Sequence, residues 1–149
     1  MKLVSVKGGR YMVITEQISF DTKGFCDQID ITKMVQKKIS ECGLENGIAL
    51  VFVPGSTGAI TTMEYEGGLR KDIRVLMNRL VPEDEEYAHN LTWGDGNGFS
   101  HVRSSLVGTS FAVPVVGGRM QLGTWQQIVF LDFDNRPRSR SLVVQVVGE

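Results

Sequence analysis

The stretch Ser105–Phe133, SLVGTSFAVPVVGGRMQLGTWQQIVFLDF, indicates the fold class of this chain. Two apolar segments, Ser105–Val116 and Met120–Phe133, flank Gly117-Gly118, and a third follows at Ser141–Val147. Adjacent glycines reach the positive φ angles that the tightest β-hairpins require. The second half of the chain is therefore predicted to consist of strands joined by hairpins.

The first half of the chain carries both strand and helix patterns. Tyr11–Phe20 is rich in β-branched and aromatic residues, and the apolar run Gly47–Val53 is typical of a buried central strand. Apolar residues that share a helical face recur in two groups: Ile31, Val35, Ile39 and Cys42, then Leu69, Ile73, Leu76, Met77 and Leu80. Gly43 is suited to end the first helix. Helices in the first half and hairpins in the second predict one α+β domain over 1–149, with a mostly antiparallel sheet.

Composition excludes several classes of protein. The chain has 149 residues, 42% of them hydrophobic, and a net charge of −1, which favours a folded domain without affinity for nucleic acid or an anionic membrane. No apolar run approaches the roughly 20 residues needed to cross a bilayer. The N-terminus lacks the pattern of a secretory signal, and Cys26 and Cys42 lack zinc-ligand or CxxC spacing. We therefore expect a cytoplasmic protein with reduced cysteines.

The two histidines, His89 and His101, bracket the polar run Gly94–Ser100. Histidine titrates near neutrality and is the commonest metal ligand, so the pair suggests acid–base groups or metal ligands. Asp95 and Asn97 would supply oxygen ligands, orient a histidine or hold substrate. The alternative is two ordinary histidines beside a Gly-rich turn in which Asp95 and Asn97 only form the turn.

A second polar loop follows the apolar run that ends at Val53. Ser56 and Thr57 lie among glycines there, an arrangement that favours an anion cradle, and Glu64 lies a few residues further on. The loop does not match the Walker A pattern. We expect Ser56 and Thr57 to contact an anion and Glu64 to act as a base or ligand.

The tetrapeptide Gly123–Gln126, GTWQ, lies inside an apolar segment. Trp125 is interpreted as a core residue, which would place Thr124 and Gln126 together on the opposite pleat face as substrate contacts. Arg136, Arg138 and Arg140 alternate, which is typical either of a phosphate-binding row or of a solvated strand edge.

The order of these motifs resembles that of the YjbQ family, a group of small proteins without a firm function. The resemblance rests on His89-Asn90-Leu91, Asp95–Gly98, Ser100-His101, Ser105–Ser110, Val113–Val115 and Leu122–Gln126. It implies an α+β fold, a homotrimer and a polar pocket between subunits. It also implies a weak, secondary thiamine-phosphate synthase activity, and zinc or similar ions and sulfate-like anions at the histidines.

The resemblance carries over residue by residue to His89, His101 and Glu64. It departs at Met63, where relatives have asparagine, and at Gly55, where many relatives have a further histidine. A catalytic zinc usually has three protein ligands. A third ligand here would have to come from Asp95, Glu64 or a neighbouring subunit.

Together these observations predict an enzyme that acts on a phosphorylated or anionic metabolite, by thiamine-phosphate synthesis or other metal-assisted chemistry. His89, His101 and Asp95 would hold zinc or magnesium, or act with Glu64 as catalytic groups. The predicted substrate contacts are Ser56, Thr57, Asn97, Arg103, Thr124, Gln126 and Arg138. The rivals are a non-catalytic metal- or metabolite-binding trimer and a purely structural oligomer. Self-association is expected because Phe111–Val115 and Ile128–Phe133 supply more apolar surface than one thin sheet would bury.

Overall fold

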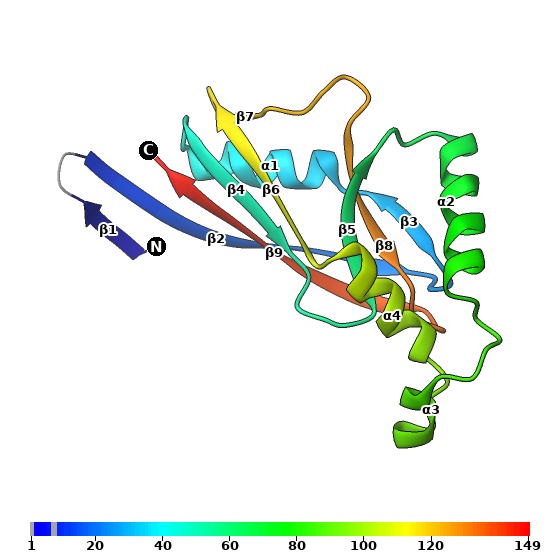
Figure 1. Ribbon diagram of the computed structural model, residues 1–149. Helices are drawn as coiled ribbons and strands as arrows, with labels where there is room; N and C mark the ends of the chain where they lie inside the picture. The colour runs from blue at the N-terminus through cyan, green and yellow to red at the C-terminus, as the bar shows by residue number, and fades with distance from the viewer. Residues whose placement is uncertain (1, 7–8) are drawn as a thin grey trace.

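The computed structural model describes residues 2–6 and 9–149, and its strands form two antiparallel sheets (Figure 1). The larger sheet has the order β1-β2-β9-β4-β6-β7, with bounds Lys2–Val6, Gly9–Thr22, Arg138–Gly148, Gly47–Phe52, Ser110–Val116 and Arg119–Met120. The smaller sheet has the order β3-β8-β5, with bounds Asp27–Asp30, Gln127–Asp132 and Gly58–Met63. The helices are α1 (Thr32–Cys42), α2 (Gly67–Leu80), α3 (Ala88–Trp93) and α4 (Gly98–Val107). The fold class is α+β, as predicted.

Several elements lie where the sequence places them. Helix α1 ends at Gly43 with φ 70°, the left-handed conformation expected of a C-terminal glycine. Strands β6 and β7 form the predicted hairpin, with φ 57° at Gly117 and 70° at Gly118. Positive φ at both turn residues matches the right-handed twist of the flanking strands.

Two helices, α3 and α4, occupy a region predicted to be turn and strand. Ser105 therefore lies in α4, and strand β6 begins only at Ser110. The buried residues of α4 share one helical face, but most of them are polar: Gly98, Phe99, Ser100, Arg103 and Ser104. A search for apolar periodicity misses such a helix, because hydrogen bonds take the place of apolar contacts on its buried face.

The segment Met120–Phe133 is not one strand. β7 ends at Met120, β8 begins at Gln127, and Trp125 between them is 71% exposed, so the expectation of a core tryptophan is wrong. The side chain of Gln126 accepts from Gly123 N at 3.1 Å and donates to Thr62 Oγ1 at 3.1 Å. These bonds close a surface turn around Trp125, and Thr124 and Gln126 do not share the face of a strand.

Strand β8 lies at the centre of the molecule. Ile128 and Phe130 pack into the larger core with α1 and the six-stranded sheet, and Val129 and Leu131 pack into the smaller core with α2. The apolar surface of Ile128–Phe133 is thus buried within the chain. It does not supply the surface for self-association that the sequence suggested.

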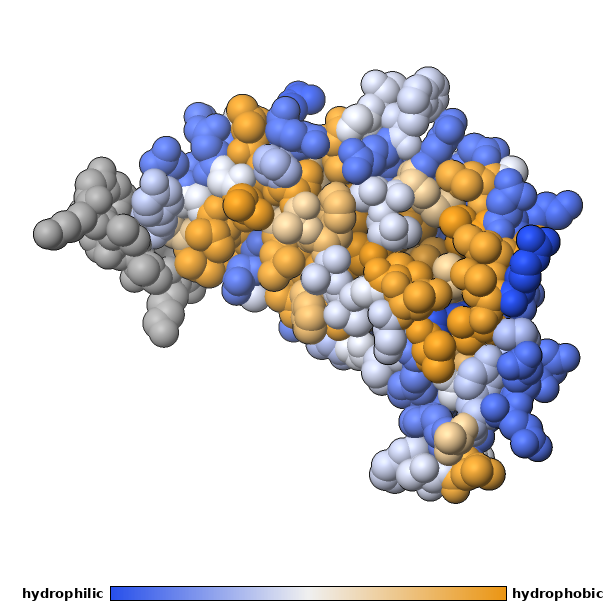
Figure 2. All heavy atoms as spheres, viewed as in Figure 1, coloured by the Kyte–Doolittle hydropathy of each residue, from blue (hydrophilic) through white to orange (hydrophobic). Residues whose placement is uncertain are grey.

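Exposed apolar surface lies instead on β4, predicted to be a buried central strand, which is central in the sheet but buried on one face only. Ala49 and Val51 are fully buried, whereas Ile48, Leu50 and Phe52 on the other face are 56%, 36% and 40% exposed. The space-filling view shows hydrophobic side chains gathered over this part of the molecule (Figure 2). Among the described residues, no helix is long and apolar enough to span a membrane.

Candidate functional site

The two histidines meet although twelve positions separate them in the sequence. His89 lies in α3 and His101 in α4, and their ring centroids are 4.2 Å apart with the rings tilted by 42°. The side chain of Asn90 joins the two helices by accepting a hydrogen bond from Gly98 N at 2.9 Å. The sequence-predicted histidine pair is therefore a contact in the folded chain.

The polar run between the helices brings Asp95 to the pair. Gly94 and Gly96, with φ 68° and 65°, turn the chain so that Asp95 Oδ1 lies 3.9 Å from His89 Nε2. With its amide nitrogen turned toward this carboxylate, Asn97 donates to Asp95 at 3.0 and 3.2 Å. Asn135 Nδ2 donates to the backbone oxygen of Asp95 at 2.8 Å, which ties the loop between α3 and α4 to the turn before β9.

Helix α4 holds His101 in place through its buried polar face. Ser100 Oγ donates to Phe133 O, just after β8, at 2.6 Å, and Ser104 Oγ donates to Gly58 O in β5 at 2.7 Å, so the helix is bonded to both chain segments at one end of the β5–β8 pair. Arg103 is fully buried and donates to Val81 O at 2.9 and 2.7 Å, to Glu83 and to Asn78. Its guanidinium joins α4 to the end of α2, which corrects the expectation that Arg103 contacts substrate.

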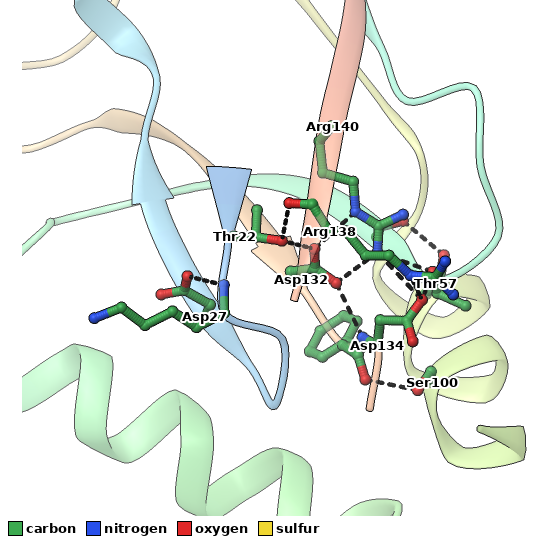
Figure 3. Close-up of polar contacts among 12 residues, drawn as sticks. Thr22, Asp27, Thr57, Ser100, Asp132, Asp134, Arg138 and Arg140 are labelled. Atoms are coloured by element: carbon green, nitrogen blue, oxygen red, sulfur yellow. Dashed lines mark hydrogen bonds and ion pairs between the residues drawn. The ribbon is translucent and has the colours of Figure 1, made fainter. Parts of the chain in front are cut away.

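A network of buried charges lies where β8 leads into β9 (Figure 3), and its member Asp134 acts on the pKa of His101. Asp132 accepts from Arg140 Nε at 2.7 Å and from Nη2 at 2.6 Å. Asp134 Oδ2 accepts from Arg138 Nε at 2.8 Å and from Thr57 Oγ1 at 3.0 Å. Thr57 is buried here as part of the network, so an incoming anion cannot use its hydroxyl proton without displacing Asp134.

A cavity of about 340 Å³ opens beside this network, and its lining residues are Asp95, Asn97, Asn135, Arg136 and Arg138. The cavity thus contains three of the sequence-predicted residues, Asp95, Asn97 and Arg138. Ser56 is exposed in the preceding loop, and no hydrogen bond of its side chain occurs among the described residues.

The remaining predicted residues, Glu64, Thr124 and Gln126, lie at the other end of β5. Glu64 and Thr124 line a separate cavity of about 490 Å³ with Trp125, and Gln126 is bonded to Thr62. Thr57 precedes β5 and Glu64 follows it. Six residues of strand span about 20 Å, so within one chain these side chains do not reach the histidines.

Comparison with known proteins places this geometry in a family. The profile described as "UPF0047 protein YjbQ-like" matches residues 16–149. The chain belongs to the YjbQ family. It is 41% identical over 145 residues to a UPF0047 protein of Methanothermobacter thermautotrophicus, covering 97% of this chain and 99% of that one. It is 36% identical over 123 residues to the UPF0047 protein YugU of Bacillus subtilis, covering 82% and 90%.

The fold of this YjbQ-family chain is similar to solved structures. One is a crystal structure of a YbjQ-like protein of unknown function from Sulfolobus solfataricus, with a TM-score of 0.88 and 32% identity over 93% of this chain and 99% of that chain. A hypothetical protein of Aeropyrum pernix gives a TM-score of 0.81 and 35% identity over 90% and 99%. The family resemblance read from the motifs is confirmed.

Burial acts on the pKa of His101 in this YjbQ-family protein. Desolvation lowers the pKa of His101, and the neighbouring His89 lowers it further, against the opposite pull of Asp95 and Asp134. Neutral imidazole is the form that accepts a proton or binds a metal. In the described part of the chain, however, no three His, Cys, Asp or Glu side chains are placed to hold a metal ion.

Sequence reasoning missed the side chains that support the site. Neither Asp132 nor Asp134 was among the predicted site residues, yet both are fully buried. Arg138 and Arg140 bond these carboxylates, while Arg136 lies exposed in the turn before β9 begins at Arg138. The three alternating arginines therefore form neither a uniform phosphate-binding row nor a solvated strand edge. The pattern D-x-D followed by R-x-R across a short turn was the available clue.

Proposed function

We propose that this chain is an enzyme that acts on a phosphorylated small molecule, with the anion held in the cavity beside Arg138 and the histidine pair moving protons. The observation that carries the proposal is the contact between His89 and His101, 4.2 Å between ring centroids, together with Asp95, which lies 3.9 Å from His89 and lines a cavity with two arginines. Guanidinium groups match the geometry of phosphate oxygens, and paired titratable groups near neutrality suit acid–base catalysis.

Each residue has a distinct role in the proposed reaction. His101, whose lowered pKa favours neutral imidazole, takes the proton of the attacking hydroxyl or water. His89, oriented by Asp95, returns a proton to the leaving group. Arg136 and Arg138 neutralise the charge that develops on phosphate or pyrophosphate as it departs. Hydrolysis of a phosphate ester uses all of these roles. Thiamine-phosphate synthesis shares only the departure of pyrophosphate beside the arginines, because the attacking thiazole nitrogen carries no proton for His101 to take.

The residues of a single chain do not fit a divalent metal ion well. A catalytic zinc usually has three protein ligands, and the described residues contain no group of three His, Cys, Asp or Glu side chains placed to hold a metal ion. No step above therefore runs through zinc or magnesium. Elemental analysis of untagged protein, beside the His89→Ala/His101→Ala variant, tests this. Near-stoichiometric zinc or magnesium that disappears in the variant would overturn the metal-free mechanism.

We also propose that the chain works as a homotrimer. Two observations favour self-association: the exposed apolar face of β4, and the distance that separates Glu64, Thr124 and Gln126 from the histidines within one chain. Another copy of the chain would cover the apolar face of β4. It would also bring its own Glu64, Thr124 and Gln126 to the histidines. Sedimentation should give three times the mass of one chain at micromolar concentration, and an Ile48→Lys variant should shift it toward monomer. A clean wild-type monomer would refute the proposal.

The decisive experiment is a turnover screen with phosphate monoesters and with the thiamine-phosphate synthase substrates, monitored by release of phosphate or pyrophosphate. His89→Gln and His101→Gln should each lower turnover about 10²- to 10⁴-fold, the usual contribution of a general acid or base. Lys37→Gln, on the exposed face of α1, serves as the control variant and should leave turnover unchanged. Tight binding of a phosphorylated compound without turnover would favour the non-catalytic binding module.

A further inference from the structure

The cavity beside Arg138 contains charges of both signs. Arg136 and Arg138 contribute guanidinium groups, and Asp95 contributes a carboxylate that is 44% exposed. A site for a fully ionised anion gains nothing from a carboxylate in its lining, because two negative charges in contact repel each other. The presence of Asp95 therefore bears on which anion the cavity accepts.

The donors of the cavity come from its arginines. Arg138 uses Nε to bond Asp134 at 2.8 Å, which fixes the plane of its guanidinium. The described residues provide no hydrogen-bond partner for its two terminal nitrogens or for the guanidinium of Arg136. Both arginines thus retain free N–H groups for the oxygens of a ligand.

Apart from the second N–H of the Asn135 amide, the remaining polar atoms of the cavity are acceptors. The amide nitrogen of Asn135 is bonded to Asp95 O at 2.8 Å, and that of Asn97 to the Asp95 carboxylate at 3.0 and 3.2 Å. Their amide oxygens and the carboxylate itself can only accept hydrogen bonds. A ligand that fills the cavity must therefore bring a donor of its own to the side occupied by Asp95.

We propose that Asp95 makes this cavity selective for a tetrahedral oxyanion that carries a proton, so that phosphate binds in preference to sulfate. The inference rests on the proposed function, in which an anion occupies this cavity, and it concerns inorganic phosphate, the product of ester hydrolysis; a monoester, whose second pKa is about 6, would bind here as its monoanion. Inorganic phosphate keeps at least one P–OH group at neutral pH, which donates to Asp95 while the other oxygens accept from the arginines. Sulfate has no proton and places an anionic oxygen against the carboxylate. Sites built to accept from a ligand hydroxyl discriminate strongly against analogues that lack it.

The test is calorimetric titration with inorganic phosphate and with sulfate at matched ionic strength. Wild-type protein should bind phosphate about tenfold more tightly than sulfate or better, equivalent to about 1.4 kcal/mol. Asp95→Asn should bring the ratio toward one, chiefly by strengthening sulfate binding, because the amide can donate to sulfate. Arg138→Gln is the matched variant: it should weaken both anions and leave the ratio close to the wild-type value.

Three results would overturn the inference: equal wild-type affinities, an unchanged ratio in Asp95→Asn, or no binding of either anion at millimolar concentration. Misfolding does not obscure the outcome, since the backbone oxygen of residue 95 still accepts from Asn135 in the variant and circular dichroism checks its helices. Failure of the proposed function is distinguishable. Selective phosphate binding without turnover in the substrate screen would refute the proposed enzymatic function and support the selectivity of the cavity.

Discussion

The two ends of β5 carry the two groups of residues that the sequence marked as functional, and they are built in different ways. At the histidine end, the side chains of Ser100 and Ser104 donate to the backbone of β8 and β5, more than thirty positions away. At the other end, the turn around Trp125 is closed mainly by bonds within Gly123–Gln127. The histidine end is thus fixed by the tertiary fold, and the Trp125 turn is a local structure that displays its ring.

This difference assigns the two ends different tasks. Groups that transfer protons must be held to within a fraction of an ångström, which buried long-range bonds achieve. An exposed aromatic ring on a self-closed turn suits contact with another molecule or another copy of the chain. Four substitutions test the contrast.

The largest effect is expected from Asp132→Asn, in the network of buried charges. Asp132 is fully buried and accepts from two nitrogens of Arg140, from Thr22 Oγ1 and from Asp134 N. Asparagine would leave Arg140 only its longer ion pair with Asp134, at 3.6 Å, and would turn an amide toward other donors, at a cost of about 3–5 kcal/mol in the free energy of unfolding. Urea denaturation measures this cost. Lys37→Gln, which removes an exposed ion pair with Glu41, is the control and should cost under about 0.5 kcal/mol.

Gly98→Ala should separate the two histidines. A Cβ at position 98 would lie 2.4 Å from Tyr87 Cβ and 2.9 Å from Asn90 Oδ1, so α3 and α4 must move apart. Overpacking of this kind costs about 1–3 kcal/mol. Nuclear Overhauser contacts between the imidazole rings of His89 and His101 should weaken at the same time. Gly67→Ala, where a Cβ meets nothing within 4 Å, is the matched control. Equal behaviour of the two variants would mean that Gly98 does not set the spacing.

A smaller effect is expected from the acid dependence of stability. Burial lowers the pKa of His101 in the folded chain, whereas the unfolded chain has the ordinary value near 6.5. The unfolded state therefore binds a proton first, and wild-type stability falls as the pH drops below about 6.5, levelling off below the folded pKa. In His101→Gln this part of the decline should be absent. Denaturation curves recorded from pH 8 to pH 5 test it, and parallel declines in the two proteins would contradict the pKa shift.

The sequence predicted α1, α2 and the β6–β7 hairpin better than it predicted the elements around the histidines. Apolar spacing located α1 and α2, and two glycines located the β6–β7 hairpin, because these features depend on local chemistry. Helix α4 was missed because Ser100, Arg103 and Ser104 bury polar groups whose partners lie elsewhere in the chain. Partners of this kind cannot be read from spacing alone.

The same limit explains the mixed outcome for the candidate residues. The histidines and Asp95 were recognised because imidazole and carboxylate side chains can be identified directly in the sequence as acid–base groups or ligands. One Gly-rich turn brings them together. Arg103 was assigned to substrate because a guanidinium can neutralise the charge on a departing pyrophosphate. In a helix, position 103 lies about 200° around the axis from position 101, so the two side chains point to different sides.

The smallest effect on the isolated fold is expected at the opposite end, from Trp125→Ala. The ring is 71% exposed and the turn is closed by Gln126, so the free energy of unfolding should change by no more than about 0.5 kcal/mol. Such an exposed ring contributes little to the free energy of unfolding of its own chain, and contact with another copy of the chain is the role tested next. If copies of the chain cover it, Trp125→Ala will weaken association in sedimentation while dilute-solution denaturation stays unchanged. A large loss of stability in dilute monomer would instead show that the ring belongs to the core, and would remove the contrast between the two ends of β5.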